Sequence, residues 1–547
     1  MKAYVVGVDF GTDSARAVVT DAGTGKLAGT GIAEYPRWKE KQYCNPAERV
    51  FRQHPQDYLD AMTACVRQAL GEAGTDVAVK VRGIAADTTG STPAPVDGAG
   101  IPLALRPEFS EEPDAMFWLW KDHSSVEEAA EVDAVLSGAG RGGTDYTRYQ
   151  GTYSSEWYWA KILHALRGQN GIRGQAVSWV EHSDWIPFLL TGGIRPQEMH
   201  RNACAAGHKA LWHSAFGGLP ARERLCVMDP DLGRVFDSFR RPEPAGTAVG
   251  IICASWAERL GLPRDTVVGL GSFDAHAGAV GAGIAPGTLV KVLGTSTVDL
   301  LVTEPGILAG KQLGSVCGQA EQSILPGMVG AEAGQAAFGD LFSWYRRLLL
   351  WPMEQLGKAD PAVGAVLPAV EENLLAVLDQ SAAAAPWDSN LVTLDWFNGR
   401  RYPEIDETAK GEIRGLTLGS GCVQVYQSLA LAAVFGSRRI FDSFLHNGME
   451  VERVTAVGGI SAKSPFVMQL LADVLGRPIQ ICAAPQACAL GAAMDAAAAA
   501  GLYPTLPAAQ TGMSAGFSHT YFPSEKRHAF FEPFYSRYIA AAEKIKL

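Results

Sequence analysis

The residues best suited to chemistry near the start of the sequence form a short polar turn between two apolar runs, YVVGV and ARAVV. The turn contains Gly11, Thr12, Asp13 and Ser14. Glycine permits backbone conformations that are closed to other residues, so that successive N–H groups can point at one anion. Asp9, just before the turn, carries the oxygen ligands that a hydrated Mg²⁺ prefers. The pattern fits a site for phosphate and magnesium, although Gly, Asp and Ser are also ordinary turn residues.

A second turn of the same kind lies in the other half of the chain. The segment 288–303, TLVKVLGTSTVDLLVT, predicts a strand, a turn and a second strand. Its turn contains Gly294, Thr295, Ser296 and Thr297. A phosphate turn repeated once in each half resembles the actin, hexokinase and Hsp70 superfamily, in which two related domains close on a nucleotide.

One acidic residue in the middle of the chain is a candidate catalytic base. In the segment 267–283, VVGLGSFDAHAGAVGAG, a predicted strand passes through a turn into a helix of small residues. Asp274 stands where the strand gives way to the helix. A carboxylate at this position either caps the helix or faces a cleft as a base, and the local sequence leaves both interpretations open.

Two further polar segments follow predicted strands. The segment 81–97, VRGIAADTTGSTPAPVD, predicts a strand that ends in small hydroxyl residues. This is typical of the ligand-binding end of an open α/β sheet, although a hydrated turn is the simpler interpretation. The apolar run MFWLWKDH ends at Lys121, Asp122 and His123, and this polar triplet is suited to line a cleft.

Hydrophobic periodicity predicts several helices. The segment YSSEWYWAKILHAL is predicted to be a helix that Ser154 or Ser155 caps. The segment 328–345 is predicted to be an amphipathic helix led by Glu332 and Gln335.

Two further segments contain candidate binding residues, namely a pair of glycines and a single lysine. The segment 453–479 predicts a strand, a turn at Gly458 and Gly459 and a helix, and two glycines at a helix start can admit a nucleotide against the backbone. Lys209 stands among small and aromatic residues in AGHKALWH, although a single lysine is usually a solvated surface residue. The sequence has no Walker A motif, no protein-kinase catalytic loop and no G-x-S-x-G elbow.

Length and composition restrict the class of protein. A chain of 547 residues suits two sizeable domains, and 47% apolar and 19% charged residues are typical of a soluble protein. The net charge of −11 does not favour nucleic acid or an anionic membrane surface as a partner. The alanine-rich segment near Ala492 is interrupted by Asp495, no apolar run of signal-peptide length precedes the first strand, and no uncharged apolar stretch approaches 18 residues. We therefore expect a cytoplasmic protein without a membrane segment.

The nine cysteines are dispersed and include no C-x-x-C motif, which favours reduced, mostly buried thiols over disulfides or a zinc site. His208 and His213 have no further ligand cluster near them in the sequence, so a metal-binding role is not expected for them.

Taken together, these motifs resemble the FGGY family of carbohydrate kinases, and within it most closely the ribulokinases. The similarity covers nearly the whole chain. It rests on DFGTDSARA, DTTGSTPAPVD, LWKDH, YSSEWYWAKILH, AGHKALWH, GSFDAHAGAVGAG, KVLGTST, EAGQAAFGD, DWFNGRR, AVGGISAK and ALGAA. DTTGSTPAP, LWKDH and AGHKALWH carry the narrower likeness, because other FGGY kinases usually have Trp-x-Asp-x-Arg where this chain has Trp120, Asp122 and Ser124.

The resemblance implies an α/β fold of two ribonuclease-H-like domains, 1–284 and 285–547, with sugar and MgATP between them. On the nucleotide side it implies that Asp9 serves Mg²⁺ and that the two turns hold the ATP phosphates. It further implies nucleotide-binding roles for Gln335, Gly458, Gly459 and Lys463. Ribulokinases often end the Gly-Gly motif with Arg-Lys-Asn, whereas this chain has Ala462, Lys463 and Ser464, which leaves the side-chain contacts with adenine open.

On the sugar side, the resemblance implies a ketopentose surrounded by Ala94, Lys209, Asp274 and Glu332, with Asp274 as general base. The implied reaction converts L-ribulose and ATP to L-ribulose 5-phosphate and ADP in L-arabinose catabolism, and the family suggests a homodimer. Two alternatives stay open. One is another FGGY kinase acting on xylulose, D-ribulose or a polyol, and the other is an actin-like ATP-binding sensor without sugar turnover.

Overall fold

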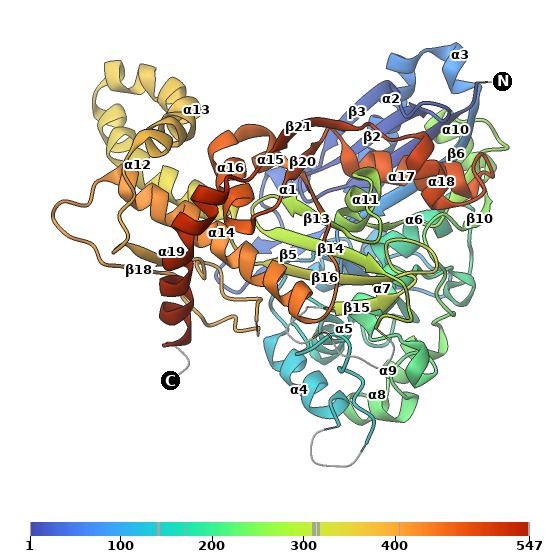
Figure 1. Ribbon diagram of the computed structural model, residues 1–547. Coiled ribbons are helices and arrows are strands. Elements are labelled where there is room, and N and C mark those ends of the chain that lie inside the picture. Colours follow the sequence, from blue (N-terminus) through green and yellow to red (C-terminus); the bar gives the residue numbers. More distant parts are fainter. Residues whose placement is uncertain are drawn as a thin grey trace.

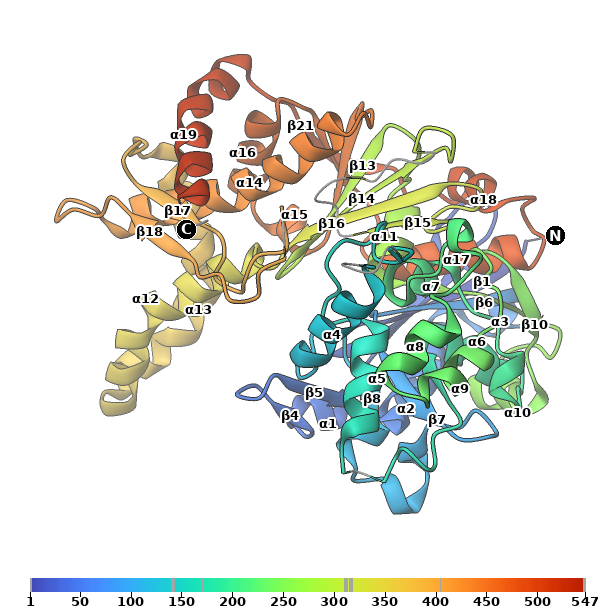
Figure 2. The same cartoon turned by 90° about the horizontal axis from the view of Figure 1, so that it is seen from below.

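Two seven-stranded sheets, one in each half of the chain, form the framework of two lobes (Figures 1 and 2). The computed structural model describes residues 2–138, 143–169, 171–308, 313, 318–403 and 405–544. The first sheet consists of β1 (Tyr4–Phe10), β2 (Ser14–Asp21), β3 (Leu27–Glu34), β6 (Val81–Thr88), β10 (Ala248–Ile251), β11 (Val267–Gly269) and β12 (Ser272–Phe273). The second consists of β13 (Thr288–Leu293), β14 (Thr297–Thr303), β15 (Gly318–Glu321), β16 (Val329–Gln335), β19 (Arg453–Val457), β20 (Ile479–Cys482) and β21 (Phe517–Tyr521).

The two sheets share one topology. In the first, β1, β2 and β3 form an antiparallel meander, β6 lies parallel beside β1, and β11 lies parallel beside β6. In the second, β13, β14 and β16 form the meander, β19 lies parallel beside β13, and β20 lies parallel beside β19. This repeated order is that of a ribonuclease-H-like domain and confirms the predicted fold class. Both predicted hairpins are present as β1–β2 and β13–β14.

Smaller sheets and helices surround this framework. The remaining strands are β4 (Cys44–Asn45), β5 (Val50–Gln53), β7 (Pro93–Val96), β8 (Phe117–Trp118), β9 (Ser178–Glu181), β17 (Val392–Leu394) and β18 (Glu412–Arg414). The helices of the first half are α1 (Pro36–Lys39), α2 (Pro55–Ala73), α3 (Thr75–Ala78), α4 (Val126–Leu136), α5 (Tyr158–Arg167), α6 (His182–Leu190), α7 (Ala203–Ala210), α8 (Arg222–Met228), α9 (Leu232–Asp237), α10 (Ala254–Leu260) and α11 (Asp274–Gly281). Those of the second half are α12 (Gly339–Ala359), α13 (Pro361–Ala384), α14 (Cys422–His446), α15 (Gly459–Lys463), α16 (Pro465–Leu475), α17 (Ala487–Ala499), α18 (Leu506–Gly512) and α19 (Glu525–Glu543).

Helix α17, from near the end of the chain, packs against the sheet formed by the start of the chain. A Cβ atom on Gly7 in β1 would lie 1.9 Å from the carbonyl oxygen of Ala489 in α17. A Cβ on Gly491 would lie equally close, 1.9 Å, to the carbonyl oxygen of Ala277 in α11. Only glycine permits these close approaches, so small residues let α17 pack against both α11 and β1 and join the two halves.

Two sequence-based predictions of helix position are wrong. Glu332 and Gln335 lie in strand β16, which pairs with β14 and β15, and the helix of this segment begins only at Gly339. The strand extends through Gln335 because β14 pairs with it along its whole length, whereas β15 pairs only with its first half, up to Glu332. Helix α5 begins only at Tyr158, with Trp157 at its N-cap, so neither Ser154 nor Ser155 caps it. The Ser154 hydroxyl accepts the N–H of Glu156, and the Ser155 hydroxyl donates to Glu407.

Helices α12 and α13 form a hairpin that projects from the second lobe (Figure 2). By length and composition alone α13 is apolar enough to cross a membrane, with a mean hydropathy of 1.4 over 18 residues, of which 6% are buried. The helix also carries Glu371, Glu372 and Asp379, and one such helix is weak evidence for a membrane span.

The eight cysteines within the described residues are free thiols, which confirms the prediction of reduced cysteines for these positions. Only Cys65 and Cys204 are fully buried, fewer than expected, and Cys422 is exposed. Cys317 lies outside the described residues.

Candidate active site

Each predicted phosphate turn is closed by a backbone hydrogen bond from its glycine. The Gly11 N–H donates to the Ser14 carbonyl over 3.1 Å, and the Gly294 N–H donates to the Ser296 carbonyl over 3.0 Å. Neither glycine has a positive φ, so the expectation that Gly11 adopts a conformation closed to other residues is wrong. What both glycines contribute is an absent side chain at the point where each strand turns back.

Neighbouring elements hold each turn in place. In the first turn, the Thr12 hydroxyl accepts from Trp120 Nε1 over 3.1 Å and the Asp13 carboxylate accepts from Trp38 Nε1 over 2.6 Å. In the second, the Thr295 carbonyl accepts from the backbone N–H groups of Phe338 (2.8 Å) and Asp340 (3.1 Å) at the start of α12. The turns are therefore fixed before any phosphate binds.

Buried carboxylates gather beside the first turn. Asp9 in β1 and Asp87 in β6 lie directly opposite each other in the parallel register, and Arg16 Nη1 lies 3.3 Å from Asp9 Oδ2. Burial raises the pKa of both carboxyl groups, Asp87 well above its usual range because the charge of Asp9 adds to the effect. Neither oxygen of Asp87 receives a hydrogen bond from the described residues. Oxygen ligands short of positive charge are what a hard divalent cation requires, so these residues fit Mg²⁺.

Asp274 is the first residue of α11, and its Oδ1 accepts the N–H of Ala275 over 2.7 Å. Burial, supported by the negative charge of Asp9, raises the pKa of Asp274 to about 7. The charge of Glu332 adds a smaller upward effect on the pKa of Asp274. A carboxyl group that titrates near neutral pH is suited to accept a proton from an alcohol.

Lys209 and Glu332 form an ion pair between the two lobes. Lys209 Nζ in α7 lies 3.0 Å from Glu332 Oε1 in β16 and 5.4 Å from the ring centre of Trp157. Burial alone would raise the Glu332 pKa, but Lys209 and the neighbouring histidines hold it well below its usual range. The Lys209 pKa is raised, because Glu332 outweighs the effect of burial. The pair therefore presents one fixed positive and one fixed negative charge.

Two histidines and a cysteine surround the same carboxylate. His276 Nε2 lies 3.0 Å from Glu332 Oε2, and Cys204 Sγ makes a close contact with His276 Nδ1. His208 Nδ1 lies 3.9 Å from Glu332 Oε2. The ligand atoms of His208, His276 and Glu332 lie within 4.8 Å of one another. The expectation that no further ligand residues lie near His208 is therefore wrong, because residues distant in the sequence meet in the fold. His276 and Lys209 each lie within hydrogen-bonding distance of one Glu332 oxygen, so both oxygens are already engaged within the protein.

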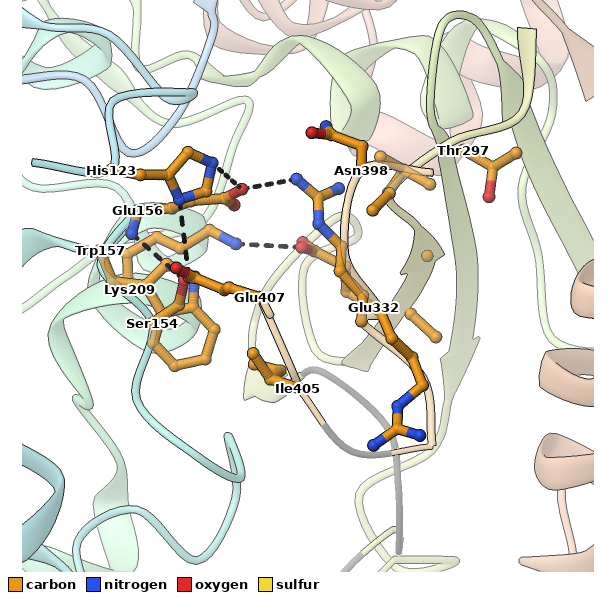
Figure 3. Close-up of a pocket in the computed structure, with 16 residues that line it drawn as sticks. His123, Ser154, Glu156, Trp157, Lys209, Thr297, Glu332, Asn398, Ile405 and Glu407 are labelled. Carbon is orange, nitrogen blue, oxygen red and sulfur yellow. Dashed lines mark hydrogen bonds and ion pairs between the residues drawn. The ribbon is translucent and has the colours of Figure 1, made fainter. Parts of the chain in front are cut away.

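A pocket opens beside this ion pair (Figure 3). Of the residues predicted for the site, Lys209, Thr297 and Glu332 line it, and so does His123 from the polar triplet at 121–123. Asp274 is not among the residues that line the pocket, and Ala94 is fully buried in β7. The sequence reasoning missed Glu156 and Glu407, and it treated Trp157 only as a packing residue; all three line the pocket.

The residues expected near adenosine differ in how closely they contact the rest of the protein. Gly458 has a φ of 102°, and a Cβ on it would lie 2.5 Å from the Leu293 carbonyl oxygen, so glycine is required there. A Cβ on Gly459 would meet no atom within 4 Å, which leaves room for a ligand. Lys463 is exposed, whereas the hydroxyl of Ser464 donates to Asp379 Oδ2 over 2.6 Å and is engaged within the protein.

Gln335 is buried, and its amide group is engaged within the second lobe. Its Nε2 donates to Asp395 Oδ2 over 2.9 Å and to the Ala433 carbonyl over 3.0 Å, while its backbone N–H donates to Thr297 Oγ1 over 3.1 Å. The backbone of Gln335 therefore supports Thr297 in the second turn, while its side chain holds Asp395.

The known proteins that this chain resembles are carbohydrate kinases. The model of the C-terminal domain of the FGGY family of carbohydrate kinases matches residues 289–500. The chain is 44% identical over 526 residues to a ribulokinase of Vibrio parahaemolyticus, covering 96% of this chain and 92% of that one. It is 36% identical to a ribulokinase of Geobacillus thermodenitrificans, covering 98% and 93%.

The solved structures agree on the fold. A xylulose kinase from Rhodospirillum rubrum superposes with a TM-score of 0.77 at 21% sequence identity, covering 99% of both chains. The chain belongs to the FGGY family of carbohydrate kinases. The family predicted from the motifs is confirmed.

Proposed function

We propose that this kinase transfers the γ-phosphoryl group of ATP to the terminal hydroxyl of L-ribulose, giving L-ribulose 5-phosphate and ADP. The observation that carries the proposal is the position of Asp274 in the chain: it directly follows β12, which pairs with β6 beside Asp87, and it lies two residues before His276, whose ring contacts Glu332. The relatives named ribulokinase, which align over nearly the whole chain, support ribulose as the acceptor.

Different residues of the chain bind the phosphates, the magnesium ion and the adenosine. Phosphoryl transfer requires mainly positioning and charge stabilisation, and the two turns at 11–14 and 294–297 offer backbone N–H groups and hydroxyl groups for the phosphates. Asp9 and Asp87 would hold Mg²⁺, which neutralises charge on the phosphoryl oxygens when bound. Gly459, where a Cβ would meet no atom within 4 Å, leaves the backbone open for the adenosine, and Gly458 forms the tight turn before it.

On the sugar side, Glu332 accepts hydrogen bonds from sugar hydroxyl groups and Lys209 donates to them. Asp274 accepts the proton of the attacking hydroxyl. A pKa of about 7 leaves a substantial fraction of Asp274 unprotonated at neutral pH, while keeping it basic enough to take the proton late in the transfer. The two lobes exclude water from the reacting phosphoryl group when they enclose both substrates.

The test is ADP release with MgATP across L-ribulose, D-ribulose, L-xylulose, D-xylulose, ribitol and glycerol. We expect the highest kcat/KM with L-ribulose. Turnover with xylulose or glycerol alone would support a carbohydrate kinase but would exclude ribulose as its substrate. ATP hydrolysis that no sugar stimulates would favour an actin-like ATP-binding sensor.

The proposal extends to a homodimer through the α12–α13 hairpin. This projecting hairpin carries large apolar side chains that are each more than half exposed: Leu348, Trp351, Leu356, Val366 and Val377. A second copy that supplies the same hairpin covers both apolar faces in a two-fold symmetric helical contact. Light scattering should give twice the mass of the chain, and Trp351→Glu with Leu356→Glu should give a monomer. A monomeric wild-type protein would exclude this contact.

A further inference from the structure

A loop of the second lobe reaches across to the first lobe beside the sugar pocket. The loop follows β17, and its described residues are 395–403 and 405–407. Arg401 Nη2 donates to Glu156 Oε1 over 2.6 Å, and Ser155 Oγ donates to Glu407 Oε1 over 3.0 Å. Glu156 and Ser155 belong to the first lobe, immediately before α5. Each of these contacts therefore joins the two lobes.

The same loop is anchored to the second phosphate turn. At the start of the loop, Asp395 is buried, and its carboxylate accepts from Gln335 Nε2 over 2.9 Å and from the Tyr538 hydroxyl over 2.7 Å. The backbone of Gln335 in turn donates to the hydroxyl of Thr297. A continuous set of hydrogen bonds thus connects the phosphate turn with the base of the loop.

The ion pair is shielded from solvent and lies in the sugar pocket. The side chains of Arg401 and Glu156 are 23% and 16% exposed. Burial alone would raise the Glu156 pKa, but Arg401 and His123 hold it below its usual range. Both side chains line the pocket together with Lys209 and Glu332 (Figure 3). Removing one partner of a shielded pair leaves the other charge uncompensated, which costs more free energy than the same change in an exposed surface pair.

We propose that residues 395–403 and 405–407 form an interlobe clasp, in which Arg401 and Glu156 are positioning residues that hold the second lobe over the bound sugar. The inference rests on the proposed function, because it assigns the pocket to the sugar. The pair breaks whenever the lobes separate, since its partners belong to different lobes. Sugar binding between the lobes and formation of the Arg401–Glu156 ion pair therefore stabilise each other. The hydrogen bonds of Gln335 with Asp395 and Thr297 couple this ion pair to the second phosphate turn.

The first measurement is steady-state kinetics of a charge-swap series with L-ribulose. Arg401→Glu and Glu156→Arg should each raise the sugar KM about tenfold or more, because each places two like charges in contact. The double variant Arg401→Glu/Glu156→Arg restores an opposite pair and should recover most of that loss. ATP affinity without sugar should change less than twofold. Arg414→Glu is the matched control, since Arg414 pairs with Glu412 inside the second lobe.

The second measurement is independent of the reaction. Small-angle X-ray scattering should give a larger radius of gyration for Arg401→Glu than for the wild type or Arg414→Glu, and the charge-swapped double variant should return toward the wild-type value. Variants that leave both KM and the radius unchanged, or a double variant no better than the worse single one, would overturn the clasp. An absence of ribulose-dependent turnover in the wild type would instead overturn the proposed function and leave the scattering result as the test of the clasp.

Discussion

Lys209 Nζ lies 3.0 Å from Glu332 Oε1, although 123 positions separate the two residues in the chain and they belong to different lobes. The contact places a fixed positive and a fixed negative charge side by side in the pocket. A sugar has only hydroxyl and carbonyl groups, and hydrogen bonds between these and charged groups are the stronger kind. The pair is therefore the central recognition element of the proposed sugar site.

Removing the charge of Glu332 should weaken sugar binding. In Glu332→Gln the side chain keeps its shape but no longer attracts Lys209 and His276. Hydrogen bonds to charged groups contribute about 1.5–3 kcal/mol, so we expect the KM for L-ribulose to rise about 10- to 100-fold. Steady-state kinetics measures this change, with Glu321→Gln on the neighbouring strand β15 as control. An unchanged KM would show that Glu332 does not contact the sugar.

His276 should act through Glu332. Its Nε2 lies 3.0 Å from Glu332 Oε2, so the ring orients the carboxylate toward the pocket. We expect His276→Asn, which is too short to reach, to raise the sugar KM by about tenfold while kcat falls less. His276→Gln can place an amide N–H near the former Nε2 and should retain most of the affinity. Equal KM values for both variants and the wild type would exclude this positioning role.

The proposed base should appear in the pH dependence of the reaction. Burial and Asp9 raise the pKa of Asp274 to about 7, and only the unprotonated carboxylate accepts a proton. We therefore expect kcat/KM to rise as the pH increases toward 7, with Mg²⁺ shifting the rise to lower pH because a cation favours the carboxylate. Asp274→Asn should lower kcat by about 10²- to 10⁴-fold and remove this rise. A variant that keeps the wild-type pH profile would assign the base elsewhere.

When no metal is bound, ionisation of Asp274 should lower the stability of the folded protein. Asp274 has a folded-state pKa of about 7, above its ordinary value of 3.8. Its contribution to stability is therefore fully present below pH 3.8 and is lost as the pH rises through 7. In metal-free protein, the Tm of the wild type should fall between pH 6 and pH 8 by more than that of Asp274→Asn. Differential scanning calorimetry compares the two, and parallel pH dependences would contradict the raised pKa.

The fold was predictable because its strongest signals are local. Each hairpin consists of apolar strands around a Gly-Thr turn, and the strand–turn–helix units at Asp274 and Gly458 have similarly clear boundaries. Glu332 was the exception. Its strand, VGAEAGQ, has too few large apolar residues to show a period of two, and pairing with β14 and β15 decides the structure instead.

The site was predictable only in part, because its remaining contacts are long-range. Asp9, Asp274, Lys209 and Glu332 came from motifs. The pair of Glu156 and Arg401 joins residues that are 245 positions apart, and no local pattern indicates such a contact. The two adjacent arginines at 400 and 401, at the end of the motif DWFNGRR, were the only available signal.

A buried ion pair behind the second phosphate turn should control the stability of that lobe. Lys291 Nζ in β13 lies 2.7 Å from Asp299 Oδ2 in β14, directly opposite in the register, and both side chains are fully buried. Burial lowers the Lys291 pKa and raises the Asp299 pKa, so each charge depends on the other. Lys291→Met leaves an unpaired buried carboxylate and should lower the free energy of unfolding by about 3–5 kcal/mol.

The matching double variant separates the ion pair from simple packing. Lys291→Met/Asp299→Leu removes both charges and replaces them with apolar groups of similar size, which is often neutral or stabilising for a buried pair. We therefore expect urea denaturation to show the double variant to be more stable than Lys291→Met alone. A single variant that unfolds at the wild-type urea concentration, or a double variant that is less stable than the single one, would show that the two charges do not depend on each other. If the expected order holds, the register of β13 and β14, and with it the turn at 294–297, is specified by mutual neutralisation of these two residues.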